Sequence, residues 1–504
     1  MKKMFLYLAG SFAAVSLLAA DTPNIVWIFG EDMGPELGCY GDAQAITPNM
    51  DRLAREGARF THCFTHAPVC APSRSGLITG MYPTTIGTHH MRSKLTSPPA
   101  TFTSYLRQSG YFVAWPGKTD FNFDVPNDAF DSTADWLTGT GVQPTANKKA
   151  GRKAGPEKLP QPFFAFINLG DSHESSIRMM DKFTKFTANL KPAERHDPAK
   201  MSVPPYHPDA PEVRRDLANY YDLVTAVDHQ VGAVLKFLEE QGWADNTVVF
   251  LTGDHGRGLP RSKRWVYDSG IHVPLIVRWP GKIKPGSVRE DLVSFIDFAP
   301  TVLALANAAG RTHPWLLPGG ERNGARNGKL ASTGGAGGGA VHMQGRVFLG
   351  PKSEPEPRYL FAARDRMDET YDRIRAVRTK QFKYIRNFEP QLPYAQRIAY
   401  MEEMPTMQGW RRLNAEGKLN EAQKLFFAPA KPREELYDTQ SDPHEIRNLA
   451  DSPKHQAVLQ ELRAALDRWI EDTHDLGAVP EPELIKRGLV RDVLSTYAER
   501  RQLK

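Results

Sequence analysis

Cysteine is scarce in this chain, whose 504 residues include three. Three cysteines are too few for a disulfide scaffold in a protein of this size, and an odd number leaves at least one thiol unpaired. At least one of Cys39, Cys63 and Cys70 therefore needs a role other than a structural disulfide.

A strong charge of one sign is also lacking. The chain has 64 Lys and Arg against 58 Asp and Glu, for a net charge of +6. An excess this small, spread over the whole length, indicates no particular class of partner. The sequence has no long basic run with interleaved aromatic residues, so it gives no support to nucleic-acid binding.

Long apolar runs are missing beyond residue 20, so we expect no transmembrane segment in the mature chain. The first residues, Met1-Lys2-Lys3, precede an apolar stretch, Met4–Ala20, and then Asp21. This pattern is typical of a signal peptide over residues 1–20, with cleavage after Ala20. The alternative is a membrane anchor, but glycine and serine interrupt the stretch. We therefore predict export, to the periplasm or outside the cell.

Three continuous apolar segments each end in polar residues. They are Asn24–Phe29 before Glu31-Asp32, Phe163–Leu169 before Asp171 and His173, and Thr247–Thr252 before Asp254-His255. Such segments are typical of buried parallel strands. Helical patterns at Met50–Gly57 and Arg214–Gln241 lie between them.

Alternating strands and helices predict an α/β domain with helices on both faces of a sheet. The three polar strand ends would then meet at one edge, where sites form in such sheets. The alternative is that each strand end is an ordinary solvated loop.

We predict two domains after the signal peptide, because about 480 residues exceed the usual 100–200 residues of one domain. The large α/β domain covers residues 21–354 and carries a Gly-rich insertion at 319–339. The smaller α+β domain covers residues 355–504. Its expected elements are strands at Tyr359–Ala363, Ile374–Arg378 and Phe382–Arg386, and an amphipathic helix within Pro453–Thr473.

One short segment carries a chemical signature. Cys70-Ala71-Pro72-Ser73-Arg74 is followed by Ser75-Gly76-Leu77-Ile78-Thr79-Gly80. Taken alone, Pro72 and Ser73 could simply begin a helix. The whole segment resembles the type I sulfatase signature, Cys-x-Pro-Ser-Arg-x-x-x-x-Thr-Gly, and matches it at every fixed position. Further similar segments extend over nearly the whole mature chain, among them Pro23–Val26, Asp254–Gly256, Val273–Leu275 and Glu435–Asp438.

The resemblance implies a fold and an activity. The large domain would have the alkaline-phosphatase-like α/β fold, with a central, mostly parallel sheet and a smaller C-terminal domain. The activity would be that of a sulfuric ester hydrolase in which Cys70 is oxidised to formylglycine. A formylglycine-generating enzyme or an anaerobic maturase would make this modification. The hydrated aldehyde has two hydroxyls, of which one attacks sulfur and the other allows sulfate to leave.

The same resemblance implies a metal site. Its ligands would be Glu31, Asp32, Asp254 and His255, together with the modified Cys70. Oxygen-rich ligation suits calcium, and also magnesium. The family usually has Asp where Glu31 stands, so the way Glu31 coordinates is left open.

Four basic residues match family positions around the sulfate. Arg74 would hold the hydrated aldehyde, and Lys118 would contact both the aldehyde and the sulfate. His173 would lie near the leaving group, and Lys263 would bind the sulfate and could protonate the leaving oxygen. Asp120 stands where most members have His, which removes one expected donor and places an acid among the substrate-binding candidates.

The substrate is expected to be a sulfated polysaccharide or oligosaccharide, carrying an O-sulfate or an N-sulfamate, as in the glycan-directed, sulfamidase-like branch. Two charged segments could recognise the sugar. The first contains His90 and Arg92, and the second contains Arg364, Asp365 and Arg366. The alternative is that both are plain surface charge.

Two other functions stay open at this point. One is a phosphonate or phosphate monoester hydrolase of the same superfamily, and the other is an inactive glycan-binding protein. Cys39 and Cys63 match no chemical motif and are expected to be small buried apolar residues.

Overall fold

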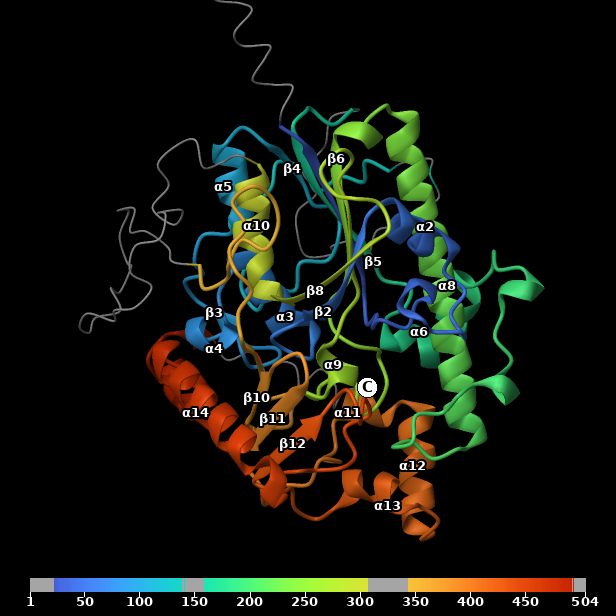
Figure 1. Cartoon of the computed structure of the whole chain (residues 1–504), viewed down its shortest axis with the longest axis vertical. Coiled ribbons are helices and arrows are strands. Elements are labelled where there is room, and N and C mark those ends of the chain that lie inside the picture. Colours follow the sequence, from blue (N-terminus) through green and yellow to red (C-terminus); the bar gives the residue numbers. More distant parts are fainter. Residues whose placement is uncertain (1–21, 138–139, 141–157, 307–342, 492, 494–504) are drawn as a thin grey trace, which may run out of the picture.

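The computed structural model describes residues 22–137, 140, 158–306, 343–491 and 493. The expected signal peptide and the Gly-rich insertion lie outside the described residues. Within them, no helix combines the length and apolar character needed to cross a bilayer. Two main sheets organise the molecule, a large one in the upper part of Figure 1 and a small one in the lower part.

The large sheet has seven strands in the order β4-β5-β1-β6-β7-β2-β8. Its centre is parallel, because β1 (Asn24–Gly30) pairs in parallel with both β5 (Phe163–Leu169) and β6 (Thr247–Gly253). The remaining strands are β4 (Phe112–Ala114), β7 (Leu275–Arg278), β2 (Ala58–Phe64) and β8 (Ser287–Ser294), and β7 alone runs antiparallel to its neighbours. This confirms the predicted α/β domain with a mostly parallel sheet.

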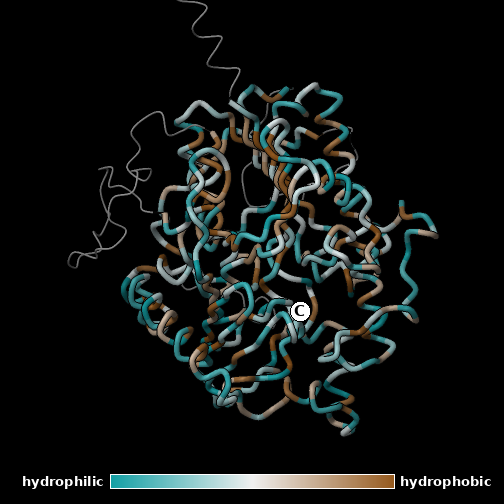
Figure 2. Tube along the Cα trace, viewed as in Figure 1, coloured by the Kyte–Doolittle hydropathy of each residue, from teal (hydrophilic) through white to brown (hydrophobic). Residues whose placement is uncertain are grey.

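Helices cover both faces of this sheet (Figure 1). One layer contains α2 (Pro48–Glu56), α6 (Glu174–Arg178) and the long α8 (Pro211–Glu240), and the other contains α3 (Cys70–Thr79), α5 (Phe102–Gln108) and α10 (Phe298–Leu305). Alternate residues of β1 pack on the two faces of the sheet. Val26 and Ile28 face α8, whereas Trp27 faces α10 and stacks on Phe298 with ring centroids 4.5 Å apart. In Figure 2 the apolar colour accordingly follows the central strands.

The small sheet is antiparallel, in the order β12-β11-β10-β9. Its strands are β9 (Leu360–Arg364), β10 (Ile374–Arg378), β11 (Phe382–Asn387) and β12 (Glu434–Asp438), and α14 (Gln456–Asp472) packs against it through Leu459, Leu462 and Leu466. Three strands lie within one residue of the predicted positions, and the helix lies within the predicted stretch, beginning three residues after its start. The sequence analysis had not identified β12 as a strand.

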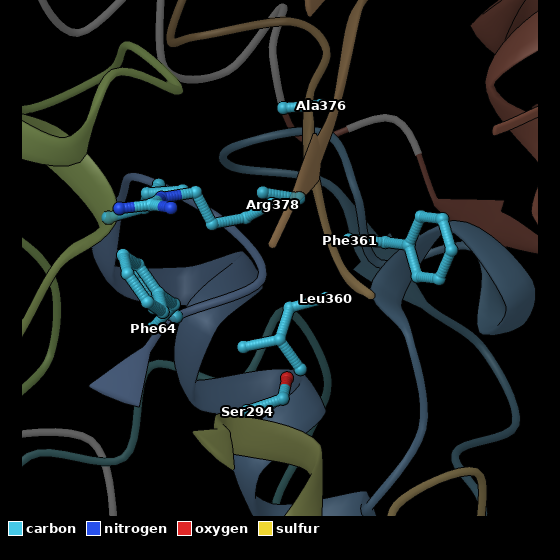
Figure 3. Close-up of a pocket in the computed structure, with 9 residues that line it drawn as sticks. Phe64, Ser294, Leu360, Phe361, Ala376 and Arg378 are labelled. Atoms are coloured by element: carbon cyan, nitrogen blue, oxygen red, sulfur yellow. The ribbon is translucent and has the colours of Figure 1, made fainter. Parts of the chain in front are cut away.

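The two sheets meet at a seam that Figure 3 shows in close-up. Phe64 and Ser294 come from the large sheet, and Leu360 and Arg378 come from the small one. The Arg378 guanidinium lies 5.0 Å from the centre of the Phe64 ring. It also pairs with Asp268 at the start of α9 (Asp268–Ile271), at 2.9 Å. Apolar and ionic contacts therefore join the C-terminal region to the edge of the large sheet.

Shorter elements complete the described chain. They are α4 (Pro83–Ile86), β3 (Lys94–Leu95), α7 (Met180–Phe186), α11 (Ala399–Glu402), α12 (Pro405–Ala415), α13 (Glu421–Lys424), α15 (Glu481–Lys486) and β13 (Val490–Arg491). Of these, α12 packs against α8, which ties the C-terminal region to the helical layer of the large sheet.

Candidate active site

The carboxyl ends of β1, β5 and β6 meet at one edge of the large sheet, as predicted. The Glu31 N–H donates to the Leu169 carbonyl at 2.9 Å, and the Asp254 N–H donates to the Gly30 carbonyl at 3.2 Å. At Gly253 an added Cβ would lie 1.9 Å from the Met33 carbonyl oxygen, so only glycine fits there. The three strand ends are thus locked together, and their polar residues face a common space.

Cys70 begins α3 and is 2% exposed. Its Sγ atom lies 3.4 Å from His255 Nε2, while the Ser73 hydroxyl, one turn further on, donates to the Asp254 carbonyl at 2.7 Å. Burial raises the pKa of the Cys70 thiol to about 12. The unmodified side chain is therefore a neutral thiol near pH 7, and a neutral thiol is a poor nucleophile.

Four buried side chains form a cluster with metal-ligand character. One ligand atom from each of Asp32, Cys70, Asp254 and His255 lies within 4.8 Å of the others. His255 Nδ1 lies 2.9 Å from the Gly256 carbonyl, which accepts a hydrogen bond, so Nδ1 carries the proton and Nε2 keeps its lone pair. A fixed imidazole lone pair beside two carboxylates is the donor set expected of a cation site.

The two carboxylates of the cluster have different environments. Lys263 Nζ donates to both oxygens of Asp32 at 2.8 Å, yet burial outweighs this charge and raises the pKa of Asp32. Asp254 accepts the Asp32 N–H at 2.8 Å and lies 3.3 Å from Arg74. Burial alone would raise the pKa of Asp254, but the neighbouring His255 and the cations Arg74, Lys118 and Lys263 overcome it and lower that pKa. Asp254 is consequently held as a carboxylate.

Glu31 lies beside this cluster and contacts other groups. Its Oε1 accepts from Asn168 Nδ2 at 2.8 Å and lies 3.4 Å from Arg74, and its Oε2 lies 3.5 Å from Lys118 Nζ. Within the described residues the four-membered metal-binding cluster does not include Glu31. The longer side chain thus reaches the two cations instead, and its expected role as a metal ligand stays a prediction.

Arg74 is buried and held on several sides. Its Nη2 atom donates to Asn168 Oδ1 at 2.6 Å, and its guanidinium lies 4.8 Å from the centre of the Phe29 ring. Asn168 was not identified from the sequence, although it is a lone polar residue inside an apolar strand. A Cβ on Gly117 would lie 2.6 Å from the Asn168 Cβ, so this glycine lets the Lys118 loop approach the strand.

Lys118 carries a second positive charge to the site. Its Nζ atom lies 3.7 Å from Asp120 Oδ2 as well as 3.5 Å from Glu31. Burial opposes the charged form, but the negative charge of Glu31, with that of Asp120, outweighs it and raises the pKa of Lys118. Asp120 adopts a left-handed backbone conformation with φ of 48°, and its half-buried carboxylate remains close to the basic group.

His173 and Lys263 both lie beside Asp32. His173 caps the N-terminus of α6 through Nδ1, which accepts from the Ser175 N–H at 3.2 Å. Burial, Lys263 and Lys118 lower the pKa of His173 well below its ordinary range. The imidazole is therefore neutral at pH 7.

Glu174 is a buried acid of the site that the sequence analysis missed. Its two oxygens accept from Arg264 at 2.9 Å each, and Lys263 lies 2.8 Å from it. The backbone N–H of Glu174 donates to Asp32 Oδ2 at 2.7 Å. Burial opposes ionisation, but Arg264 and Lys263 lower the pKa of Glu174 to about 2. Glu174 thus links a metal-cluster carboxylate to two cations, and its position directly after His173 was the signal available in the sequence.

The prediction that a C-terminal segment contacts the glycan is wrong for Arg364 and Asp365, because both side chains are fully buried. Arg364 pairs with Asp372 at 3.1 Å and lies 4.9 Å from the centre of the Trp265 ring. Asp365 pairs with Arg375 at 3.0 Å. Alternating charge here marks internal ion pairs.

Arg366 and His90 are also buried, where the C-terminal region contacts the large domain. Arg366 donates to both carboxylate oxygens of Glu481, at 2.6 and 2.7 Å, and to the Met91 carbonyl at 2.8 Å. The backbone N–H of Arg366 donates to His90 Nδ1 at 3.3 Å. This geometry corrects the expectation that these two side chains face a sugar. Arg92 keeps an exposed fraction of 35% while donating to Asp368, so it remains a candidate contact.

Cys63 is buried, as predicted, and Cys39 is half-buried. Neither takes part in the metal-binding clusters found among the described residues.

The fold and the site define a hydrolase of anionic esters. A side chain with nucleophile potential begins a helix, beside a cation-binding cluster and within a ring of Arg and Lys residues, and this arrangement suits the stabilisation of a negatively charged transition state.

Comparison with known proteins gives the family. The sulfatase family matches residues 23–308, and the chain belongs to this family of sulfuric ester hydrolases. An ulvan-active sulfatase of Formosa agariphila is 37% identical over 514 aligned residues, covering 94% of this chain and 79% of that protein. Human N-sulphoglucosamine sulphohydrolase is 28% identical, covering 92% of each chain.

Solved structures agree on the fold. One is described as a complex with its substrate D-glucosamine-2-N,6-O-disulfate; it has a TM-score of 0.62 and 19% identity, and covers 91% of this chain and all of that one. Identity this low supports the shared fold alone.

Proposed function

We propose that this sulfatase removes sulfate from a sulfated glycan, with formylglycine made from Cys70 as the nucleophile. The observation that carries the proposal is the cluster around Cys70, whose Sγ lies within 4.8 Å of ligand atoms of Asp32, Asp254 and His255. Glycan-directed relatives over nearly the whole chain support the class of substrate.

The nucleophile needs the modification, because the buried thiol is neutral and a sulfated thiol has no easy route to release. A formylglycine-generating enzyme or an anaerobic maturase would oxidise Cys70 to an aldehyde, whose hydrate carries two hydroxyls on one carbon. One hydroxyl oxygen bonds to sulfur while the bond from sulfur to the sugar oxygen breaks, and the sugar oxygen takes up a proton. Loss of a proton from the second hydroxyl then expels sulfate and restores the aldehyde.

The residues of the cluster fit a hard divalent cation. Asp32, Asp254 and the free Nε2 of His255 would hold it together with the modified residue 70, and Glu31 stands directly beside them. Calcium suits this largely oxygen donor set, and magnesium suits it as well. When bound, the cation supplies positive charge that favours the deprotonated hydrate and the sulfate oxygens.

The protein's own cations complete the site. Arg74, held by Asn168 and Glu31, would orient the hydrate, and Lys118 would contact both the hydrate and the sulfate. Lys263 would face the sulfate and the departing oxygen, together with His173. These charges are fixed by buried partners before substrate arrives, so little reorganisation is needed in the transition state.

Substrate contacts beyond the sulfate would come from half-exposed groups at the rim, Arg92 and Asp120. Both O-sulfate and N-sulfamate groups are compatible with the site. The expected leader peptide fits a role outside the cytoplasm, where sulfated polysaccharides are met.

A desulfation screen tests the proposal. The enzyme, made in a host that contains the maturase, should release sulfate from defined sulfated oligosaccharides, and the Cys70→Ala variant should release none. Aryl phosphonate and phosphate monoesters are assayed in parallel. Faster turnover of phosphonates than of every sulfated sugar would reject the proposal and favour the phosphonate hydrolase, and binding without turnover would favour an inactive glycan-binding protein.

A further inference from the structure

The protonation of His173 is determined by its contacts with Ser175. The Ser175 backbone N–H donates to His173 Nδ1 at 3.2 Å, and Ser175 Oγ lies 3.0 Å from the same atom. A backbone N–H can only donate, so Nδ1 must present its lone pair. In the neutral imidazole the ring proton therefore resides on Nε2.

The Ser175 hydroxyl is itself oriented by two further side chains. Lys182 Nζ, from α7, donates to Ser175 Oγ at 2.9 Å, and an ammonium group has no acceptor. The Tyr400 hydroxyl, from α11, shares a hydrogen bond with the same serine. Because Lys182 donates to Oγ, the Ser175 hydroxyl keeps its own proton available for Nδ1 of His173, 3.0 Å away.

The imidazole lies next to the reaction centre. One ring nitrogen of His173 is within 4.8 Å of carboxylate oxygens of Asp32 and Glu174. The ring is half-buried, and the Tyr400 ring stands nearly perpendicular to it at a centroid distance of 6.4 Å. The orientation of His173 is thus fixed by one helix start and by a tyrosine from the C-terminal region.

We propose that Ser175, through its backbone N–H and its hydroxyl, and Lys182, through that hydroxyl, are positioning residues that hold His173 as its Nε2–H tautomer, ready to donate a hydrogen bond to the oxygen that links sulfur to the sugar. This inference rests on the proposed sulfatase mechanism. Negative charge develops on that oxygen as its bond to sulfur breaks, and a donor that is already oriented stabilises it. A neutral imidazole can do this without giving up its proton. With the other tautomer, Nε2 would present a lone pair to the same oxygen and repel it.

The kinetic test uses a series of aryl sulfates, from 4-nitrophenyl sulfate, with a good leaving group, to phenyl sulfate, with a poor one. Ser175→Ala and Lys182→Met should lower kcat/KM for phenyl sulfate by roughly tenfold to a hundredfold, the effect typical of outer hydrogen-bond partners at an active site. The loss on 4-nitrophenyl sulfate should be much smaller, because that leaving group needs little stabilisation. Ser175→Thr should restore activity, since it keeps the hydroxyl.

Lys185→Met is the matched control, because it removes the same charge from an exposed position of the same helix. It should leave the whole series unchanged. Equal losses on all leaving groups in Ser175→Ala and Lys182→Met would overturn the proposal, since they would indicate a structural defect, and an unchanged series in both variants would overturn it as well.

A spectroscopic test needs no turnover. ¹⁵N NMR of histidine-labelled protein distinguishes protonated from bare ring nitrogens, and the His173 signals are assigned by their loss in His173→Gln. A bare Nδ1 in the wild type supports the proposal, and a protonated Nδ1 overturns it. A protein that hydrolyses no sulfate ester but shows the bare Nδ1 would refute the proposed function while leaving the tautomer assignment in place.

Discussion

Glu31 and Arg74 face each other 3.4 Å apart at the buried end of β1. The carboxylate that the family resemblance assigns to the metal is thereby engaged with the arginine that would hold the nucleophile. Asp254 also contacts Arg74, at 3.3 Å, but keeps its place in the cation-binding cluster. The two acids of the site are therefore expected to respond differently to substitution.

Asp254→Ala should abolish calcium binding and activity together, because the cluster loses one of its two carboxylates, the one that is held ionised. Glu31→Gln should lower kcat strongly while retaining most of the bound calcium, since its main contacts are with Arg74 and Asn168. Calcium per protein, measured by elemental analysis after dialysis, separates the two effects. Loss of calcium in Glu31→Gln equal to that in Asp254→Ala would make Glu31 a full ligand.

Activity should depend on the chemical state of residue 70. Burial raises the pKa of the Cys70 thiol to about 12, so protein that retains the thiol should be inactive across the neutral pH range. Peptide mass spectrometry on preparations from hosts with and without the maturase should show activity proportional to the formylglycine fraction. An active preparation with only the thiol at residue 70 would refute the mechanism.

Arg366→Ala should destabilise the protein without selecting among substrates. Removing Arg366 from this partly buried bidentate pair leaves Glu481 without its cation, at a cost of about 1–3 kcal/mol. Thermal unfolding measures this loss, and the ratio of activity on a glycan to activity on an aryl sulfate should not change. Arg358→Ala is the control, because its ion pair with Glu461 is exposed and contributes little. A loss of activity on the glycan alone would show that Arg366 takes part in substrate recognition.

Asp475 should make the free energy of unfolding depend on pH in the acid range. Burial opposes its charge, but Arg375 lowers its pKa from 3.8 to about 2. A depressed folded-state pKa adds stability above pH 3.8 that is lost as the pH falls towards 2, a contribution of about 2 kcal/mol by linkage.

Asp475→Asn should therefore be less stable than the wild type at pH 6, with the difference shrinking as the pH falls to 3. Urea unfolding at each pH measures it. Asp472→Asn, at an exposed position of α14, should follow the wild type throughout. A constant difference between pH 6 and pH 3 would show that the carboxylate charge is not responsible.

The sequence allowed the core of the site to be predicted because that part of the structure follows local rules. Each central strand is a continuous apolar run, and parallel strands must bring their polar ends to one edge. Asp32, Asp254 and His255 therefore converge as expected. Cys70 joins them from α3, whose first residues are the signature itself.

The sequence could not distinguish a charged surface loop from a network of internal ion pairs. Arg364 and Asp365 alternate in charge like solvent-facing residues, but their partners, Asp372 and Arg375, lie on neighbouring segments that only the folded sheet brings close. Asn168 escaped notice for a related reason: its role depends on Arg74, which is 94 residues away in sequence.

The burial of Cys70 has a consequence for the order of events during synthesis. His255, which closes over the thiol, follows it by 185 residues in the chain. The finished fold leaves Cys70 2% exposed, so on the proposed mechanism a maturase would have to reach it before β6 and its following loop have been made and packed. Oxidation would then precede folding. A chain that folded first would stay inactive, and the fraction of active enzyme would depend on the relative rates of oxidation and folding.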